Sequence, residues 1–186
     1  MKKVFNFTLF LVLMLAAVVV FAQEKDESGA GALGEGIAFY NGGKYAEAAD
    51  ALGKLVETDE KNRRAWLYLG MSRAKLKDGS EAVKAFRKAD KLEGGTPEPG
   101  ALKIVRKPRV NYTDSARANM TQGTVKLAVE FGADGKILAV VAFQKLPDGL
   151  TENSIDAAKK IVFEPAYKDG KAISTIGIVS YTFTIY

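Results

Sequence analysis

The chain has 186 residues, 47% hydrophobic and 26% charged, which is a globular composition long enough for one ordinary domain or two small ones. It contains no cysteine and no histidine, which excludes thiol nucleophiles, Cys/His zinc sites, histidine bases and Ser-His-Asp triads. Its net charge of +5 is too mild to indicate a nucleic-acid partner. Composition still allows an oxygen-only metal site or carboxylate chemistry, but no motif supports either, and we expect no catalytic residue, no cofactor, no metal and no nucleic acid.

Residues 1–22 are predicted to be a cleaved secretory signal peptide. Lys2 and Lys3 give this segment a positive start, and residues 9–22 carry no polar side chain. Val20 and Ala22 fit the small-residue rule for a cleavage site that follows Ala22. The predicted location of the mature protein is therefore the periplasm.

An uncleaved anchor in the inner membrane, facing the periplasm, is the alternative for the same segment. The apolar stretch of residues 4–22 is barely long enough to cross a bilayer. Asn6 and Thr8 lie within it and weaken this alternative.

Residues 30–93 contain an internal repeat with a period of 34 residues. The matched pairs are Gly36/Gly70, Glu47/Glu81, Ala48/Ala82 and Leu52/Phe86. The second copy also has Trp66, Leu69 and Ala89, which complete W-x2-L-G and A-x3-F patterns. This period and pattern resemble the tetratricopeptide repeat, which implies two helical hairpins whose helices approach closely at the small residues.

In repeats of this family the first helix of each unit lines a concave groove. By spacing, the groove residues are Tyr40, Leu67, Met71 and Ala74, with Arg64 at the rim. Two repeats make a marginal fold, since about three are normally needed. We therefore expect the repeats to lean on the rest of the chain or on another protein, and packing or an oligomer contact is favoured over a specific peptide in the groove.

Residues 94–106 are predicted to be a linker between two domains. The stretch EGGTPEPG, residues 93–100, breaks the helical pattern with three glycines and two prolines. Beyond it we expect a helix capped by Thr113 or Asp114, and a second helix with Thr151 as its N-cap and with Ile155, Ala158 and Val162 facing inward. The expected strands cover residues 124–131 and 137–144 and the uncharged C-terminal residues 172–186, in which apolar and polar residues alternate from Val179 onward.

Residues 107–186 resemble the C-terminal domain of TonB-family proteins. The resemblance rests on a set of motifs in the right order and spacing: Pro108, Tyr112, Ala116, Arg117, Gly123-Thr124-Val125, Asp134-Gly135, Ala157, Phe163-x-Pro165-Ala166 and Asp169-Gly170-Lys171. The predicted fold class is α+β with two domains. Tetratricopeptide hairpins are followed by a small α-β-β-α-β domain with a three-stranded antiparallel sheet.

The connections of this small domain place its last strand at a sheet edge. A helix joins the second and third strands, so the all-antiparallel solution puts the first strand in the centre. The last strand holds no charge, although natural sheet edges usually carry a lysine, a proline or a bulge. An unprotected edge accepts another strand through main-chain hydrogen bonds. The predicted partner-binding residues are Val179, Ser180, Tyr181, Thr182, Phe183 and Thr184.

These patterns predict an exported, non-enzymatic adaptor that binds proteins through the repeat groove and the edge strand. The TonB resemblance implies that the edge strand pairs with a segment of an outer-membrane transporter or another envelope protein. A homodimer through the last strand is the alternative use of that edge. A TonB-type energy transducer, anchored by an uncleaved N-terminal helix, is the alternative function. The resemblance implies that such a transducer typically has a histidine in its membrane helix and a long proline-rich spacer that crosses the periplasm. This chain has no histidine, and its linker is short.

Overall fold

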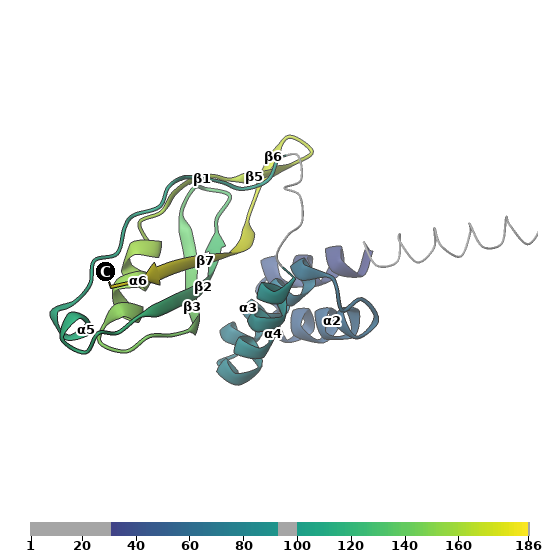
Figure 1. Ribbon diagram of the computed structural model, residues 1–186. Helices are drawn as coiled ribbons and strands as arrows, with labels where there is room; N and C mark the ends of the chain where they lie inside the picture. The colour runs from purple at the N-terminus through teal and green to yellow at the C-terminus, as the bar shows by residue number, and fades with distance from the viewer. Residues whose placement is uncertain (1–30, 93–99, 186) are drawn as a thin grey trace, which may run out of the picture.

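The computed structural model of the protein describes residues 31–92 and 100–185 (Figure 1). The predicted signal peptide and residues 94–99 of the predicted linker lie outside these ranges. The elements are a helix over residues 31–41, α2 (Tyr45–Thr58), α3 (Arg63–Lys75), α4 (Gly79–Lys91), β1 (Lys103–Arg106), α5 (Asp114–Ala118), β2 (Gly123–Phe131), β3 (Ile137–Gln144), α6 (Leu150–Ala158), β4 (Val162–Glu164), β5 (Ala166–Lys168), β6 (Lys171–Ile173) and β7 (Thr175–Phe183).

The first four helices form two hairpins that close on the glycines of the repeat. A β-carbon at Gly36 would lie 2.6 Å from Leu52 Cγ, and one at Gly70 would lie 2.6 Å from Phe86 Cε1. Both distances are shorter than van der Waals contact, so only glycine allows this approach of the two helices. The predicted reason for the repeated glycine is confirmed.

Side-chain caps fix where the helices of the second hairpin begin. Asn62 accepts a hydrogen bond from the backbone N–H of Ala65 at the start of α3. Asp78 does the same for Glu81 at the start of α4. These caps satisfy backbone donors that the first helical turn leaves unpaired.

The central sheet has the strand order β3-β2-β7, and both pairings are antiparallel. Strand β2 lies opposite β7 in an unbroken register from Gly123–Phe183 to Phe131–Thr175. The turn between β2 and β3 contains Gly135 at a φ of +78°. The predicted fold class and the central position of the first strand of this sheet are therefore confirmed.

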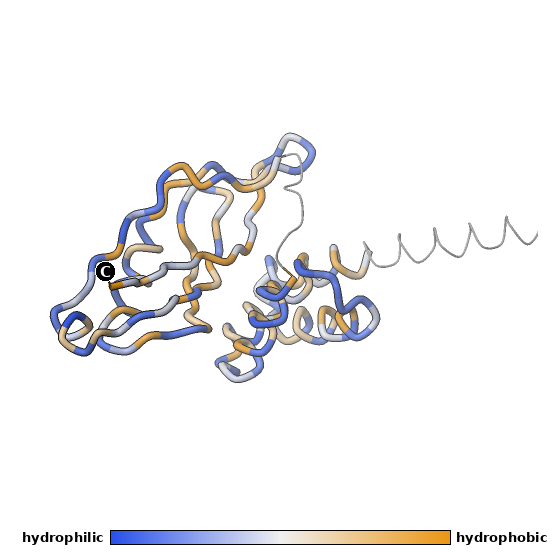
Figure 2. The backbone as a smooth tube through the Cα atoms, viewed as in Figure 1, coloured by the Kyte–Doolittle hydropathy of each residue, from blue (hydrophilic) through white to orange (hydrophobic). Residues whose placement is uncertain are grey.

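Both faces of the sheet are covered, as Figure 1 shows, with α6 on one side and the α3–α4 hairpin on the other. The first face closes a core inside the small domain, which we call the domain core; its largest fully buried members are Phe131, Leu127, Leu150, Val125 and Val129. The second face, through Ala128, Phe143 and Ile176, joins a core that includes the repeats. The repeats thus pack against the sheet, as expected for an array of only two repeats. Figure 2 shows hydrophobic residues along β2, β3 and β7 and a hydrophilic tip on the β5–β6 hairpin.

Four short strands were absent from the prediction. Strand β1 pairs with β4, and it occupies residues that were assigned to the 94–106 linker. Strands β5 and β6 form a separate hairpin. Runs of three or four residues are too short to show a periodicity, which is why the sequence did not reveal them.

Three boundaries also differ from the prediction. The residue before α6 is Gly149, in the left-handed conformation, and Thr151 instead bonds back to the N–H and C=O of Leu146. Val162, expected on the buried side of that helix, lies in β4 and is 43% exposed. The last strand, expected over residues 172–186, is shorter, since β7 covers only Thr175–Phe183.

The linker reconnects with the small domain at Gly100. The Gly100 carbonyl accepts a 2.7 Å hydrogen bond from the N–H of Tyr167 in β5. Gly100 has a φ of +78°, and a β-carbon there would lie 2.7 Å from the Tyr167 carbonyl oxygen. Only glycine suits this junction, because the crowding atom belongs to the backbone.

Candidate partner-binding edge

Strand β7 lies at one edge of the central sheet, and half of its peptide groups point away from β2. In a strand, the N–H and C=O of one residue point to the same side. The Ser180 carbonyl accepts a 3.0 Å hydrogen bond from Lys107 Nζ, which lies outside the sheet. The Thr124 carbonyl accepts from Gln144 Nε2 of β3, so Thr124 turns its peptide groups away from Thr182, its partner on β7. The two observations agree that Ser180 and Thr182 direct donors and acceptors to the free edge.

Lys107 is the edge-protecting residue that the last strand itself lacks. Its amine binds the outward Ser180 carbonyl and also lies 5.0 Å from the centroid of the Tyr181 ring. Lys107 is exposed, so a side-chain rotation is enough to free the carbonyl. Burial raises the pKa of Tyr181, which keeps its ring neutral beneath the lysine. The sequence shows Lys107 only as the residue before a proline, and its role depends on the fold.

The side chains of β7 divide between the domain core and the surface. Val179, Tyr181 and Phe183 are buried in the domain core, which confirms the predicted alternation. Ser180 is half-buried and Thr182 is exposed. Of the six predicted binding residues, Thr184 lies beyond the end of β7, and the three buried ones offer no side chain to a partner. Binding at this edge stays a prediction, and it would use the backbone.

The start of β7 is held by contacts that the sequence did not predict. Ser174, just before the strand, accepts a 3.1 Å hydrogen bond on its carbonyl from the Tyr68 hydroxyl of α3. Its Oγ accepts another from the N–H of Ala133 in the β2–β3 turn. The repeats therefore contact the same strand whose other end is a candidate docking edge.

The predicted groove residues lie mostly inside the protein. Tyr40, Leu67 and Met71 are 4%, 1% and 0% exposed, Ala74 is half-buried, and Arg64 is exposed. All three buried residues belong to the core that also contains sheet residues. An outside partner therefore cannot reach these side chains in this arrangement, and groove binding remains a prediction that requires the sheet to move.

Aromatic and charged side chains surround this contact between repeats and sheet. The Tyr40 ring lies 5.4 Å from the rings of both Tyr45 and Tyr68. Lys75 Nζ lies 3.3 Å from the Glu130 carboxylate of β2. Burial, with the Glu130 carboxylate nearby, raises the pKa of Tyr40 far above its usual range, and burial also raises that of Tyr68. These phenols therefore stay protonated at neutral pH.

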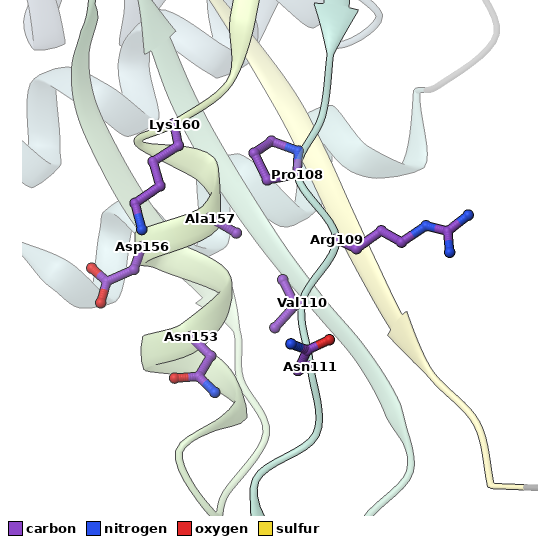
Figure 3. A pocket seen from close by; sticks show the side chains of 8 residues that line it. All are labelled: Pro108, Arg109, Val110, Asn111, Asn153, Asp156, Ala157 and Lys160. Carbon is purple, nitrogen blue, oxygen red and sulfur yellow. The ribbon is translucent and has the colours of Figure 1, made fainter.

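A surface cavity of about 310 Å³ lies between α6 and the extended segment before α5 (Figure 3). Figure 3 shows Asp156 on the helix, Lys160 in the turn that follows it, and Arg109 pointing away from it. All the polar side chains of the cavity are exposed, so none is fixed in place by burial. We assign no ligand to it. Its lining residues are Pro108, Arg109, Val110, Asn111, Asn153, Asp156, Ala157 and Lys160.

No group of three or more Asp and Glu residues in residues 31–92 and 100–185 is arranged to hold a metal ion. In the same part of the chain, no helix combines the length and apolarity needed to cross a membrane.

Comparison with known proteins assigns both halves to families. Residues 108–185 match the family model of the Gram-negative bacterial TonB protein C-terminal domain, and residues 33–96 match a tetratricopeptide repeat model. A solution NMR structure of the Pseudomonas aeruginosa TonB C-terminal domain is 24% identical, with a TM-score of 0.39, and the alignment covers 49% of this chain and 93% of that one. No curated protein matches the chain. The chain thus joins a tetratricopeptide-repeat region to a C-terminal domain of the TonB family.

Proposed function

We propose that the protein is an exported, non-enzymatic adaptor of the bacterial envelope that binds an extended segment of another protein along β7. The observation that carries this proposal is the edge position of β7, with the peptide groups of Ser180 and Thr182 turned outward. Both matched families are interaction domains, which supports a role in protein binding.

Binding would proceed by strand addition. An incoming segment pairs its N–H and C=O groups with the outward groups of Ser180 and Thr182, and the Lys107 amine leaves the Ser180 carbonyl to make room. Each backbone hydrogen bond contributes about 1 kcal/mol net, so several in a row are needed for measurable affinity. Because Lys107 is exposed, its release costs little.

The TonB family match supports an outer-membrane transporter segment as the partner and the periplasm as the location. The N-terminal signal-peptide pattern supports the same location. A second copy of β7 is the competing occupant, since an antiparallel edge is complementary to itself. Measuring both transporter-peptide binding and self-association separates these two uses.

Energy transduction is the second candidate function, favoured by the same family match and by the apolar N-terminal segment. It requires that this segment stay in the membrane as an anchor. The absence of histidine and the short connection between the last repeat helix and Gly100 count against it. N-terminal sequencing of the exported protein tests the choice: Gln23 as first residue supports the adaptor, and Met1 supports the transducer.

The edge proposal is tested by two substitutions at one position. Thr182→Pro removes an outward N–H, whereas Thr182→Lys keeps the backbone and adds an exposed charge. With a synthetic peptide from the periplasmic segment of a TonB-dependent transporter of the same organism, we expect proline to weaken binding at least tenfold and lysine to act much less. Sedimentation of both variants gives the same comparison for self-association. If the proline variant keeps its fold and both activities are unchanged, β7 is not the docking edge.

A further inference from the structure

The repeat groove already has an occupant, which is the second face of the chain's own sheet. Arg64, Tyr68, Met71 and Lys75 follow one another at i, i+4, i+7 and i+11, so they share one face of α3. Tyr68 reaches Ser174 before β7, and Lys75 reaches Glu130 on β2. Met71 lies between these two contacts and is fully buried. The groove face of α3 is therefore the face on which the sheet lies.

The sheet fits this surface with an apolar centre and a charged rim. The Phe143 ring of β3 lies 5.7 Å from that of Phe86 in α4. At the rim, Lys126 Nζ lies 2.6 Å from an Asp90 carboxylate oxygen, with side chains only 25% and 16% exposed. Removing or reversing one charge of a pair held this far from water is costly, because the other charge is left without a partner.

The small domain keeps a core of its own on the far side of this contact, and that core contains no residue of the repeats. The repeats share their core with the second face of the sheet, but the Gly36–Leu52 and Gly70–Phe86 contacts join the two helices of each hairpin without the sheet. Contacts between two regions of one chain resemble transient protein–protein interfaces, so the halves can part while these internal contacts stay in place.

We propose that the sheet autoinhibits the repeat groove: in the closed state it covers Tyr40, Leu67 and Met71, and the two halves part without unfolding to expose them. An outside segment then reaches the groove only in competition with the sheet. This inference is independent of docking at β7, because the groove lies on a face of the sheet and β7 docking uses its edge.

Thiol labelling tests this directly, because the chain has no cysteine. A single Met71→Cys substitution in the full chain reports groove exposure through its reaction rate with a chromogenic disulfide reagent. Leu52→Cys, buried between the helices of one hairpin, reports global unfolding, and Arg64→Cys at the exposed rim gives the unprotected rate. Ala74→Cys, half-buried in the same groove, replaces Met71→Cys if that variant does not fold.

The closed state is opened by Lys126→Glu, which places a carboxylate against Asp90, and is restored by adding Asp90→Lys. We expect Lys126→Glu to raise the groove labelling rate at least tenfold, to leave the Leu52→Cys rate unchanged, and to be reversed by the charge swap. The proposal is overturned if the groove thiol labels only as fast as Leu52→Cys in every background. It is equally overturned if the groove thiol labels at the Arg64→Cys rate without any opening substitution.

Discussion

The two faces of the central sheet are both buried, but they are built from different residues. On β2 the side chains toward the domain core are Val125, Leu127, Val129 and Phe131, all apolar and at most 1% exposed. The intervening side chains that meet the repeats are Lys126, Ala128 and Glu130. One face is a continuous hydrophobic core, and the other is an apolar centre flanked by ion pairs. A strand can therefore support a fold on one side and a docked region on the other.

The chemistry of each face predicts what happens when it is disturbed. Loss of an apolar contact in the domain core leaves a cavity, and the elements around it cannot separate to remove that cavity without unfolding the domain. Loss of a contact on the repeat face is limited in cost, because the halves can separate and the exposed groups are partly charged already. Substitutions on the two faces of one sheet should thus differ in magnitude and in cooperativity.

The largest effect is expected for Phe131→Ala on the domain side. Phe131 is 1% exposed and packs edge-on against Phe163 with ring centroids 5.0 Å apart. Removing a buried phenylalanine costs about 4 kcal/mol, so the free energy of unfolding in urea should fall by that amount. Tyr167→Ala is the control, because Tyr167 is 53% exposed, and it should lower the free energy of unfolding by less than about 1 kcal/mol. Similar losses for the two variants would contradict a closed domain core.

Phe143→Ala on the repeat side should cost less, about 2 kcal/mol, although Phe143 is only 4% exposed. Its ring packs on Phe86 across the interface, so the halves can part and limit the penalty. Separate probes of the helical and strand regions should then unfold at different urea concentrations. Leu138→Ala, on the same strand but 50% exposed, should keep one shared transition. A single transition in Phe143→Ala, with a loss as large as for Phe131→Ala, would mean that the two faces are equivalent.

A weaker effect is expected at alkaline pH, where buried phenols report on both faces. In the folded protein the pKa of Tyr40 is raised by burial and by the Glu130 carboxylate, whereas the pKa of Tyr181 is raised by burial. The unfolded chain ionises its phenols near pH 10, so above that pH unfolding releases their protons and the stability falls as pH rises. Each such phenol contributes up to about 1.4 kcal/mol per pH unit.

Tyr40→Phe should therefore flatten the loss of stability above pH 10 more than Tyr181→Phe does. Urea unfolding at several pH values between neutral and strongly alkaline measures both slopes. A slope unchanged by Tyr40→Phe would show that this hydroxyl is not held protonated at the repeat face.

The smallest effect is expected for Thr182→Lys, beyond the area that the repeats cover. Thr182 is exposed and its hydroxyl bonds only to that of Thr124, 3.2 Å away. The free energy of unfolding should change by less than about 0.5 kcal/mol. Thermal melting measures this change. A larger loss of stability would mean that the Thr182 side chain lies in an interface and is not exposed to solvent.

The elements with strong periodicity were predictable, and so was their order. The alternation of Val125 to Phe131 indicated one buried face of β2, and the helix between β3 and β7 required β2 to be central. The 34-residue spacing of Gly36 and Gly70 predicted close helix contacts that the structure contains. In each case the signal lies in residues near one another or in a fixed repeat.

The contact between the halves was not predictable, because its residues give no local signal. Ala128, Phe143 and Ile176 come from three strands, and no single strand shows them as a hydrophobic face. From the sequence, Lys126 and Glu130 are expected to face solvent. In the structure they form ion pairs with Asp90 and Lys75 of the repeats. The Tyr68–Ser174 bond joins residues 106 apart. Only the assembled fold brings these groups together.

The anchoring of Gly100 on β5 sets how often the repeats and the sheet meet. Because the Gly100 carbonyl is bound to Tyr167, only residues 93–99 connect the last repeat helix to the small domain. A tether this short gives an effective concentration on the order of millimolar. A contact with an intrinsic dissociation constant of about 10 μM would then be formed about ninety-nine times in a hundred. The interface can therefore be weak and still keep the groove closed for most of the time, while a competing segment at moderate concentration has a real chance of entry.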